Sequence, residues 1–261
     1  MQPIYTATNV TPAYQLNWSV SLFGKHSLTS HLASVDQLRE QTELDGVRIL
    51  EFRMVQPTVA QFFVSTQPSL SPSAIVRSLK GRWQYLIRSE CSKAFRRNYQ
   101  VVSIGDANAQ ALENYVGQQT AKHTMADPQV QRRLEALQFC DPQVELGAVR
   151  YSHYGRFIYN LQVVLESAEF LHVVQQDELS SMREAIVRTS RKKQWSLSRI
   201  GLLSNHVHCL VGAGVKETPE SIALSLMNNI SWVQGMSAVL RYSYYAGTFG
   251  PYNRAAVRRN L

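Results

Sequence analysis

The chain has 261 residues, 44% of them hydrophobic and 18% charged, a balance typical of globular proteins that argues against a disordered chain. Its formal net charge is +8, from 27 Lys and Arg against 19 Asp and Glu, and this surplus favours a polyanionic partner. Three cysteines without paired spacing, a polar start and no apolar run of about 18 residues predict a cytoplasmic protein without disulfides, signal peptide or membrane span.

The first half of the chain alternates between strand and helix patterns. Apolar and polar residues alternate over 13–23, 47–55, 59–66 and 101–104, which predicts four strands. Helices are predicted over 34–44, closed by Asp45 and Gly46, and over 74–88, opened by Ser71 and Pro72. A last helix is predicted from Ala107 to about Gln119, with Asp106 as its cap.

Residues 120–150 interrupt this pattern and read as a connector with a helical piece over 129–139. The same order of elements then returns, with strands over 157–165, 196–204, 205–213 and 244–249 and helices over 177–193, 218–235 and 252–261. Each half reads β-α-β-β-α-β-α, the split βαβ order of a ferredoxin-like domain with an added C-terminal helix. We therefore expect an α+β fold of two tandem domains, 1–119 and 151–261, that form a pseudo-dimer.

The repeat also aligns individual residues. When 55–64 is laid over 202–211, Val59 faces His206 and Gln61 faces His208. When 112–116 is laid over 257–261, Tyr115 faces Asn260.

The most suggestive short motif is Asn205-His206-Val207-His208, at the start of a predicted strand. Residues two apart on a strand point to the same face, so the two imidazoles would lie side by side, as ligands of a divalent metal do. Alone, the pair fits two half-buried polar residues at a sheet edge equally well.

A nucleophile would complete such a site. Tyr115 lies on a polar helix, and Gln119, four residues on, shares its helix face. Tyr115 could attack phosphorus and form a phosphotyrosine link, while Gln119 brings an oxygen ligand to the metal. Alone, Tyr115 reads as an ordinary amphipathic aromatic among 12 tyrosines.

Together these motifs resemble the single-tyrosine, His-hydrophobe-His (HUH) transposases of the IS200/IS605 type, which include those associated with repetitive extragenic palindromes. The resemblance rests on the His206 and His208 strand, on helix starts such as Ser71-Pro72-Ser73, and on the Tyr-x-x-x-Gln of Tyr115 and Gln119. It covers most of residues 13–119 and 157–261. It implies a metal-dependent single-strand DNA endonuclease and strand transferase that uses Mg²⁺ or Mn²⁺ and a 5′-phosphotyrosine intermediate.

Neither half keeps the whole family pattern. The first half has Tyr115 and Gln119 but lacks the histidines, and the second half has His206 and His208 but lacks the tyrosine. Because family members are dimers that can pair a tyrosine helix with the partner's histidines, we expect one composite site from Tyr115, Gln119, His206 and His208. A degenerate second site would hold Val59, Gln61 and Asn260.

The resemblance implies single-stranded, hairpin-containing DNA as the partner. The residues expected to hold phosphates are Arg77, Lys80, Arg82, Arg88, Arg96, Arg97, Arg188, Arg191, Lys192 and Lys193. Trp83 and Tyr85 are candidates for base stacking, although both also fit simple packing. With one tyrosine, the chain would act as a monomeric pseudo-dimer that nicks one strand, or as a dimer of pseudo-dimers, in the bacterial cytoplasm at the nucleoid.

The alternative is a domesticated, non-catalytic protein that binds nucleic-acid hairpins, since the first half has already lost its histidines. A hydrolytic metalloenzyme without DNA fits poorly, because the sequence has no His-Glu-x-x-His, no Gly-rich phosphate loop and no acidic ligand cluster.

Overall fold

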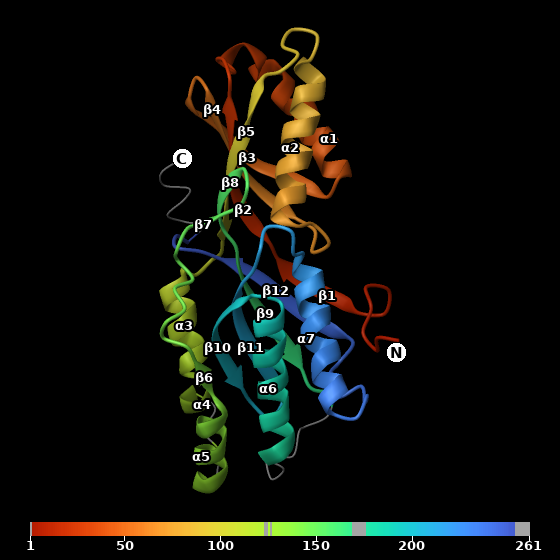
Figure 1. The fold of residues 1–261 in the computed structure, drawn as a ribbon, viewed down its shortest axis with the longest axis vertical. Coiled ribbons are helices and arrows are strands. Elements are labelled where there is room, and N and C mark those ends of the chain that lie inside the picture. The colour runs from red at the N-terminus through yellow and green to blue at the C-terminus, as the bar shows by residue number, and fades with distance from the viewer. Residues whose placement is uncertain (1, 123–124, 126, 169–175, 254–261) are drawn as a thin grey trace.

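The computed structural model describes residues 2–122, 125, 127–168 and 176–253, and it is a mixed α+β fold built on two six-stranded sheets (Figure 1). In the first sheet the order is β3-β4-β2-β5-β8-β7, and in the second it is β1-β12-β9-β11-β10-β6. No helix in the described ranges is long and apolar enough to cross a membrane.

The first sheet takes its centre from the first half of the chain. Its strands are β2 (Asn17–Gly24), β3 (Val47–Gln56), β4 (Val59–Thr66) and β5 (Phe95–Ile104), extended by β7 (Arg150–Tyr151) and β8 (Gly155–Ile158). The 3₁₀ helix η1 (Thr29–Ser34) and helices α1 (Val35–Leu44) and α2 (Pro72–Ile87) accompany it. Ser71 caps α2 by accepting a hydrogen bond from the Ala74 amide at 3.2 Å.

The second sheet repeats the arrangement. Its strands are β9 (Asn160–Glu166), β10 (Ser196–Leu202), β11 (His206–Gly212) and β12 (Ser243–Phe249), extended by β1 (Thr11–Gln15) and β6 (Phe139–Cys140). Helices α6 (Gln176–Lys192) and α7 (Pro219–Val233) cover one face. Helix α3 (Ala109–Gly117), from the first half of the chain, covers the other, followed by α4 (Gln119–Lys122) and α5 (Pro128–Leu137) (Figure 1).

Two near-continuous strands cross from one sheet to the other. β1 and β2 are separated only by Leu16, and β8 and β9 only by Tyr159, yet the members of each pair lie in different sheets. The predicted single strands over 13–23 and 157–165 are therefore wrong, because each is two strands with a fully buried residue at the break. The crossing ties the two halves into one structure.

The two crossings have matching contacts. The backbone N–H of Asn17 donates to Thr248 Oγ1 at 2.8 Å, and the backbone N–H of Asn160 donates to Ser103 Oγ at 3.0 Å. The backbones meet closely at Gly105, where a Cβ atom would lie 2.3 Å from the Thr248 carbonyl oxygen. Gly250 meets Ser103 in the same way, with 2.1 Å from its Cβ position to the Ser103 carbonyl oxygen. Any side chain at these two glycines would push the sheets apart.

Most other predicted elements are found within a few residues of their expected bounds. The last helix of the first half differs, because it begins after Asn108, whose side chain accepts from the Ala111 amide at 2.8 Å, and not after Asp106. It also ends at Gly117, so Gln119 opens the separate helix α4. Of the helix predicted over 252–261, residues 254–261 lie outside the described residues.

Candidate active site

The two histidines occupy a central strand of the second sheet. β11 pairs with β9 on one side and with β10 on the other. Because side chains alternate along a strand, His206 and His208 share one face, and their ring centroids are 4.9 Å apart. Val207 and Cys209 point the other way, into the main hydrophobic core. Burial raises the pKa of the Cys209 thiol to about 12.

Each imidazole has its Nδ1 atom engaged. His206 Nδ1 lies 2.7 Å from Asn205 Oδ1, and in the neutral tautomer with the proton on Nδ1 this nitrogen donates to that oxygen while Nε2 carries the lone pair. His208 Nδ1 lies 3.1 Å from Gln162 Nε2. A half-turn of the Gln162 amide would present its oxygen instead, and His208 Nε2 would then also be free of a proton. This is the usual way in which a hydrogen-bond partner fixes the tautomer of a metal ligand.

Helix α3 brings Tyr115 to this pair. The rings of Tyr115 and His208 meet edge to face, with centroids 5.9 Å apart, although the residues come from opposite halves of the chain. Tyr115 is 42% exposed, so a large part of the residue faces solvent. The neighbouring Val116 is buried in a small apolar cluster with Leu210 and Phe249, which anchors the helix on the sheet.

A glycine in β10 permits the helix to approach. Gly201 pairs directly with His208, and a Cβ atom there would lie 2.9 Å from Val116 Cγ1 and 3.5 Å from Gln119 Cγ. Directly paired residues present their side chains on the same face of a sheet. Gln119 therefore lies over the strand position beside His208.

Gln119 has the features of an unsatisfied ligand. It is 1% exposed, and neither its Oε1 nor its Nε2 atom has a hydrogen-bond partner among the described residues. A buried amide without hydrogen-bond partners lowers the stability of the fold by about 1–3 kcal/mol, which is offset when the amide binds a ligand. No group of three or more His, Cys, Asp and Glu in the described ranges could hold a metal, so a third ligand would have to be another residue type. Two imidazoles and an amide oxygen fit a divalent ion.

Two basic residues flank this cluster, and the sequence reading missed both. The Lys122 ammonium lies 4.7 Å from the Tyr115 ring centroid. Arg199 reaches under α3, with Nη1 3.1 Å from the Cβ position of Gly117, and its buried Nε atom has no hydrogen-bond partner within the described chain. Lys122 could have been found as a cation three residues after Gln119, but Arg199 depends on strand pairing that is not visible in sequence.

In the first sheet, the position equivalent to the histidine site is occupied by Gln61 and Arg53. Gln61 occupies the strand position that His208 has in the second sheet, since Gln61 pairs with Ser21 as His208 pairs with Val164. Its amide donates to Ser19 Oγ at 2.8 Å and accepts from Arg53 Nε at 2.8 Å. Arg53 pairs with Gln61 as Gly201 pairs with His208, so an arginine stands where the second sheet leaves room for the tyrosine helix.

The other two residues of the expected degenerate site are placed differently. Val59 pairs with Phe23 as His206 pairs with Glu166, so it holds the position of His206. Asn260 lies outside the described residues.

The predicted phosphate contacts divide into engaged and exposed residues. Arg82 forms an ion pair with Asp45 at 2.6 Å, and its hydrogen bonds hold the pKa of Asp45 below the ordinary value. Lys80 donates to the Arg97 carbonyl oxygen at 3.1 Å, and burial lowers its pKa. The exposed members are Arg77, Arg88, Arg96, Arg97, Arg188, Arg191, Lys192 and Lys193.

Of the two candidates for base stacking, one is excluded. Trp83 is fully buried against Phe62 and Phe95, so its prediction as a stacking residue is wrong. Tyr85 is 55% exposed, with the Arg88 guanidinium 4.2 Å from its ring centroid.

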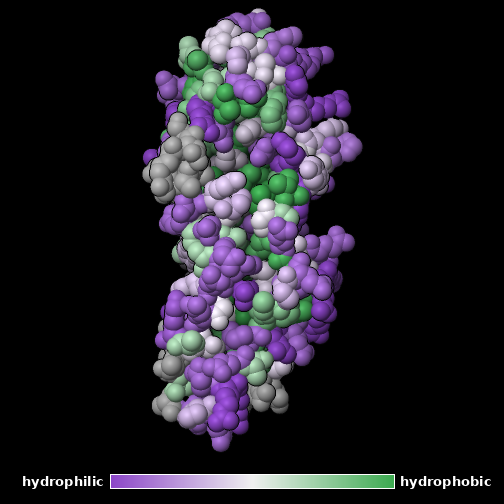
Figure 2. Space-filling model, turned by 90° about the vertical axis from the view of Figure 1, so that its left-hand side faces the viewer, coloured by the Kyte–Doolittle hydropathy of each residue, from purple (hydrophilic) through white to green (hydrophobic). Residues whose placement is uncertain are grey.

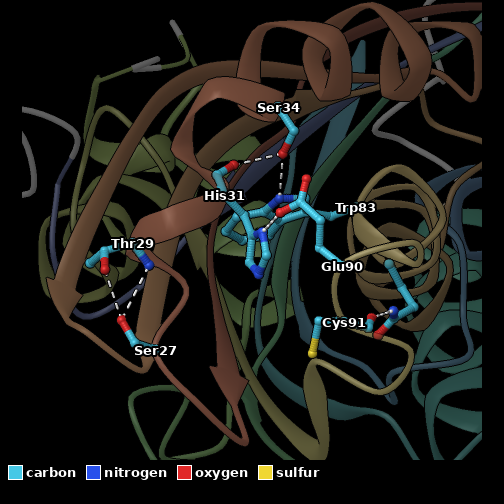
Figure 3. Close-up of polar contacts among 8 residues, drawn as sticks. Ser27, Thr29, His31, Ser34, Trp83, Glu90 and Cys91 are labelled. Atoms are coloured by element: carbon cyan, nitrogen blue, oxygen red, sulfur yellow. Dashed lines mark hydrogen bonds and ion pairs between the residues drawn. The ribbon is translucent and has the colours of Figure 1, made fainter.

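A second polar cluster lies beside Trp83 and serves the fold (Figure 3). Trp83 Nε1 donates to Ser34 Oγ at 3.0 Å, and Ser34 Oγ donates to the His31 carbonyl oxygen at 2.7 Å. His31 Nδ1 lies 3.0 Å from Glu90 Oε2. These contacts fasten η1 to α2 and the loop after it, away from the histidine strand.

Comparison with known proteins finds one family match. Residues 23–119 match the family described as Transposase IS200 like. The resemblance to the IS200-like transposases is confirmed. No curated protein sequence matches the chain.

Two solved structures are similar to parts of the chain. A candidate transposase from Deinococcus radiodurans is 17% identical over 41% of this chain and 92% of its own, with a TM-score of 0.32. A REP-associated tyrosine transposase bound to a REP hairpin is 13% identical over 43% of this chain and 67% of its own, with a TM-score of 0.32.

Proposed function

We propose that the chain is a metal-dependent single-strand DNA endonuclease and strand transferase with one composite active site. The observation that carries the proposal is the contact of Tyr115 with His208, at 5.9 Å between ring centroids, across the two halves of the chain. Tyr115 therefore lies on the face of the sheet that carries both histidines. The family match over residues 23–119 supports the same reaction class.

The composite site follows from a pseudo-dimer of two ferredoxin-like copies. The strand orders β3-β4-β2-β5 and β10-β11-β9-β12 both correspond to the split βαβ unit. Each copy receives a strand from the other, β8 beside β5 in the first sheet and β1 beside β12 in the second. The tyrosine helix of the first copy then lies on the sheet of the second.

The proposed metal ligands are His206, His208 and the Gln119 side-chain oxygen. Bound Mg²⁺ or Mn²⁺ would polarise a phosphoryl oxygen and orient the scissile phosphate. Asn205 and Gln162 fix the orientation of the two imidazoles. The burial of Gln119 keeps water from competing for its amide.

Tyr115 is the proposed nucleophile. Its hydroxyl oxygen bonds to phosphorus and gives up its proton to solvent, while the bond to the 3′-oxygen breaks and that oxygen takes up a proton. The 5′-phosphate stays on Tyr115, and a later 3′-hydroxyl reverses the step to join strands. Lys122, beside the Tyr115 ring, and Arg199, under α3, are the proposed partners of the phosphate oxygens.

One live site limits what a single chain does. The first sheet has Arg53 and Gln61 bonded to each other where the second has Gly201 and His208. A lone chain would cut and reseal one strand, and exchange of two ends would need a second chain. With a DNA substrate of this kind, we expect the protein to act at the bacterial nucleoid.

The test is a covalent adduct assay. The protein is incubated with a labelled, hairpin-containing single strand and Mn²⁺, then separated on a denaturing gel. We expect an adduct that is lost in Tyr115→Phe, in His208→Ala and in EDTA. An adduct that persists in Tyr115→Phe refutes the nucleophile, and DNA binding without any adduct supports the alternative of a non-catalytic hairpin-binding protein.

A further inference from the structure

A second surface of the protein has the composition of a nucleic-acid site. A groove of about 640 Å³ lies where the β7–β8 turn meets the beginning of β5. Its lining includes Arg97, Arg156, His153 and the tyrosines Tyr99, Tyr151 and Tyr154, and no Asp or Glu among the residues that the structure describes. Figure 1 shows β7 and β8 next to β5, on the side of the molecule along which α3 continues. This side is largely hydrophilic (Figure 2).

The groove is held in a fixed shape. The Ser152 amide donates to the Gly155 carbonyl oxygen at 2.8 Å, and the Gly155 amide donates to Ser152 Oγ at 3.0 Å. The Tyr99 hydroxyl lies 3.1 Å from Ser152 Oγ. A Cβ atom at Gly155 would lie 2.3 Å from the Tyr99 ring, so the ring rests against bare backbone and forms the floor.

The charges and rings of the groove face solvent. Tyr151 is 74% exposed and Tyr154 is 46% exposed, and the Arg97 guanidinium lies 5.7 Å from the Tyr154 ring centroid. Within the described ranges, neither Arg97 nor Arg156 forms an ion pair. Arg156 Nη2 does donate to Gln100 Oε1 at 3.4 Å, a neutral partner. Exposed aromatic rings beside arginines without an ion pair suit a single strand, whose bases stack and whose phosphates pair with cations.

The second sheet is built differently at the equivalent corner, which is the beginning of β12. Tyr245 pairs with Val164 in the second sheet as Gln100 pairs with Ser21 in the first, so Tyr244 holds the strand position that Tyr99 has. At that corner Tyr242, two residues before Tyr244, packs against the buried Tyr5 at 5.1 Å between ring centroids. The chain therefore closes the second corner with its own N-terminal segment.

The two corners also differ in charge. Glu166 holds the strand position that Phe23 has at the groove, and it pairs with Arg241 at 3.0 Å. Phe23 lines the groove and has no carboxylate with which an arginine could form an ion pair. One corner is filled and neutralised, and the other is open, aromatic and positive.

We propose that this groove binds a short single-stranded segment of nucleic acid, with bases on Tyr151 and Tyr154 and phosphates on Arg97 and Arg156. The inference rests on the proposed function, which supplies the single strand. Since β7, β8 and helix α3, which carries Tyr115, lie along the same side of the molecule (Figure 1), we expect the groove to hold DNA that continues from the cleaved phosphate.

The experiment measures binding without cleavage. A fluorescent oligo-dT strand is titrated in EDTA by anisotropy against the parent chain, Tyr154→Ala/Arg156→Ala, and the matched control Tyr14→Ala/Arg48→Ala. Tyr14 is 45% exposed and Arg48 has a 71% exposed side chain, so the control removes the same groups elsewhere on the surface. We expect binding about fivefold weaker or more in the groove variant, as for loss of one stacked base, and less than twofold weaker in the control. Thermal melting checks that both variants fold.

Two further arms separate the outcomes. A blunt duplex offers no free bases, so its affinity should fall less than that of oligo-dT in the groove variant. An iodouracil-substituted strand should cross-link to Tyr151 or Tyr154 on irradiation. Equal affinity of the groove variant and control for oligo-dT overturns the inference and leaves a protein partner as the occupant. A further outcome is that the parent chain forms no covalent adduct while the groove variant still binds oligo-dT more weakly than the parent. That result would support the groove as a binding site and refute the proposed cleavage function.

Discussion

Gly201→Ala tests whether the docking of α3 on β10 forms the active site. A Cβ atom at Gly201 would lie 2.9 Å from Val116 Cγ1 and 3.2 Å from the Val116 carbonyl oxygen. Carbon atoms at rest are about 3.5–4.0 Å apart, so the helix must retreat by roughly 0.6–1 Å. Val116 is buried and β-branched, and its side chain has little freedom to turn away.

The helix that retreats carries Tyr115. A displacement of about 1 Å at a reacting group can reduce a rate by roughly 10²-fold. We expect the initial rate of adduct formation in Gly201→Ala to fall by that order. Overpacking costs about 1–3 kcal/mol, partly offset by about 0.5–1 kcal/mol from replacing glycine in a strand, so the fold should survive.

The assay is the rate of covalent adduct formation on a denaturing gel, with thermal melting beside it. Gly147→Ala is the matched control, because no atom lies within 4 Å of its Cβ position. Gly201→Arg, which copies Arg53 of the first sheet, should abolish the adduct. A Gly201→Ala rate within about twofold of the parent would refute the role of α3 docking, since a displacement of that size should slow the reaction at an active site that contains Tyr115.

Three further predictions concern the fold around the site. At pH 8, Ellman's reagent should react with the exposed Cys140 and spare Cys209 until the chain unfolds, because burial raises the pKa of Cys209 to about 12; equal rates would contradict the placement of β11. Ser103→Ala should lower the free energy of unfolding by about 1–3 kcal/mol in urea melts, since Ser103 Oγ joins both sheets by hydrogen bonds of 2.6 and 3.0 Å; a loss under about 0.5 kcal/mol would show that the crossing is not held there. Because Arg82 lowers the pKa of Asp45 in the folded chain, their pair stabilises fully above the unfolded value of 3.8 and the effect fades as pH falls through the lower folded value. Asp45→Asn should therefore have a slightly lower melting temperature than the parent at pH 7, as expected for a partly exposed ion pair, and the difference should shrink as the pH is lowered; a difference that does not shrink at acid pH would contradict the prediction.

Local patterns were sufficient for most single elements. The strand predicted over 59–66 is β4, with the same bounds. Ser71 and Pro72 open α2, and Gly46 ends the turn after α1 with a φ of +78° that favours glycine. These features depend on neighbours within a few residues, so the sequence carries their signal.

Features set by distant pairing could not be read in the same way. Leu16 and Tyr159 continue the alternation of their strands, so nothing in the local pattern marks the change from one sheet to the other. Arg199 and Gln162 approach the histidine face only because β9, β10 and β11 are neighbours. Gly201 did carry a signal, because a glycine inside an apolar strand often marks a close backbone approach.

The repeat was the strongest guide to the candidate site. Laying one half over the other placed Val59 with His206 and Gln61 with His208, and the strand pairings put them at the same positions. It did not disclose Arg53, which fills the first sheet where Gly201 leaves the second open. The roles of Tyr115, Gln119 and the histidines remain predictions of this account.

The central claim is that Tyr115 and the histidines of the same chain form one site, and mixing inactive variants tests it most directly. Tyr115→Phe and a His206→Ala/His208→Ala variant are each incubated with the labelled strand and Mn²⁺, alone and mixed in equal amounts. The account predicts an adduct with the parent chain and none with either variant or with their mixture, because neither variant chain holds both parts of the site. An adduct restored in the mixture, or formed by either variant alone, would contradict it.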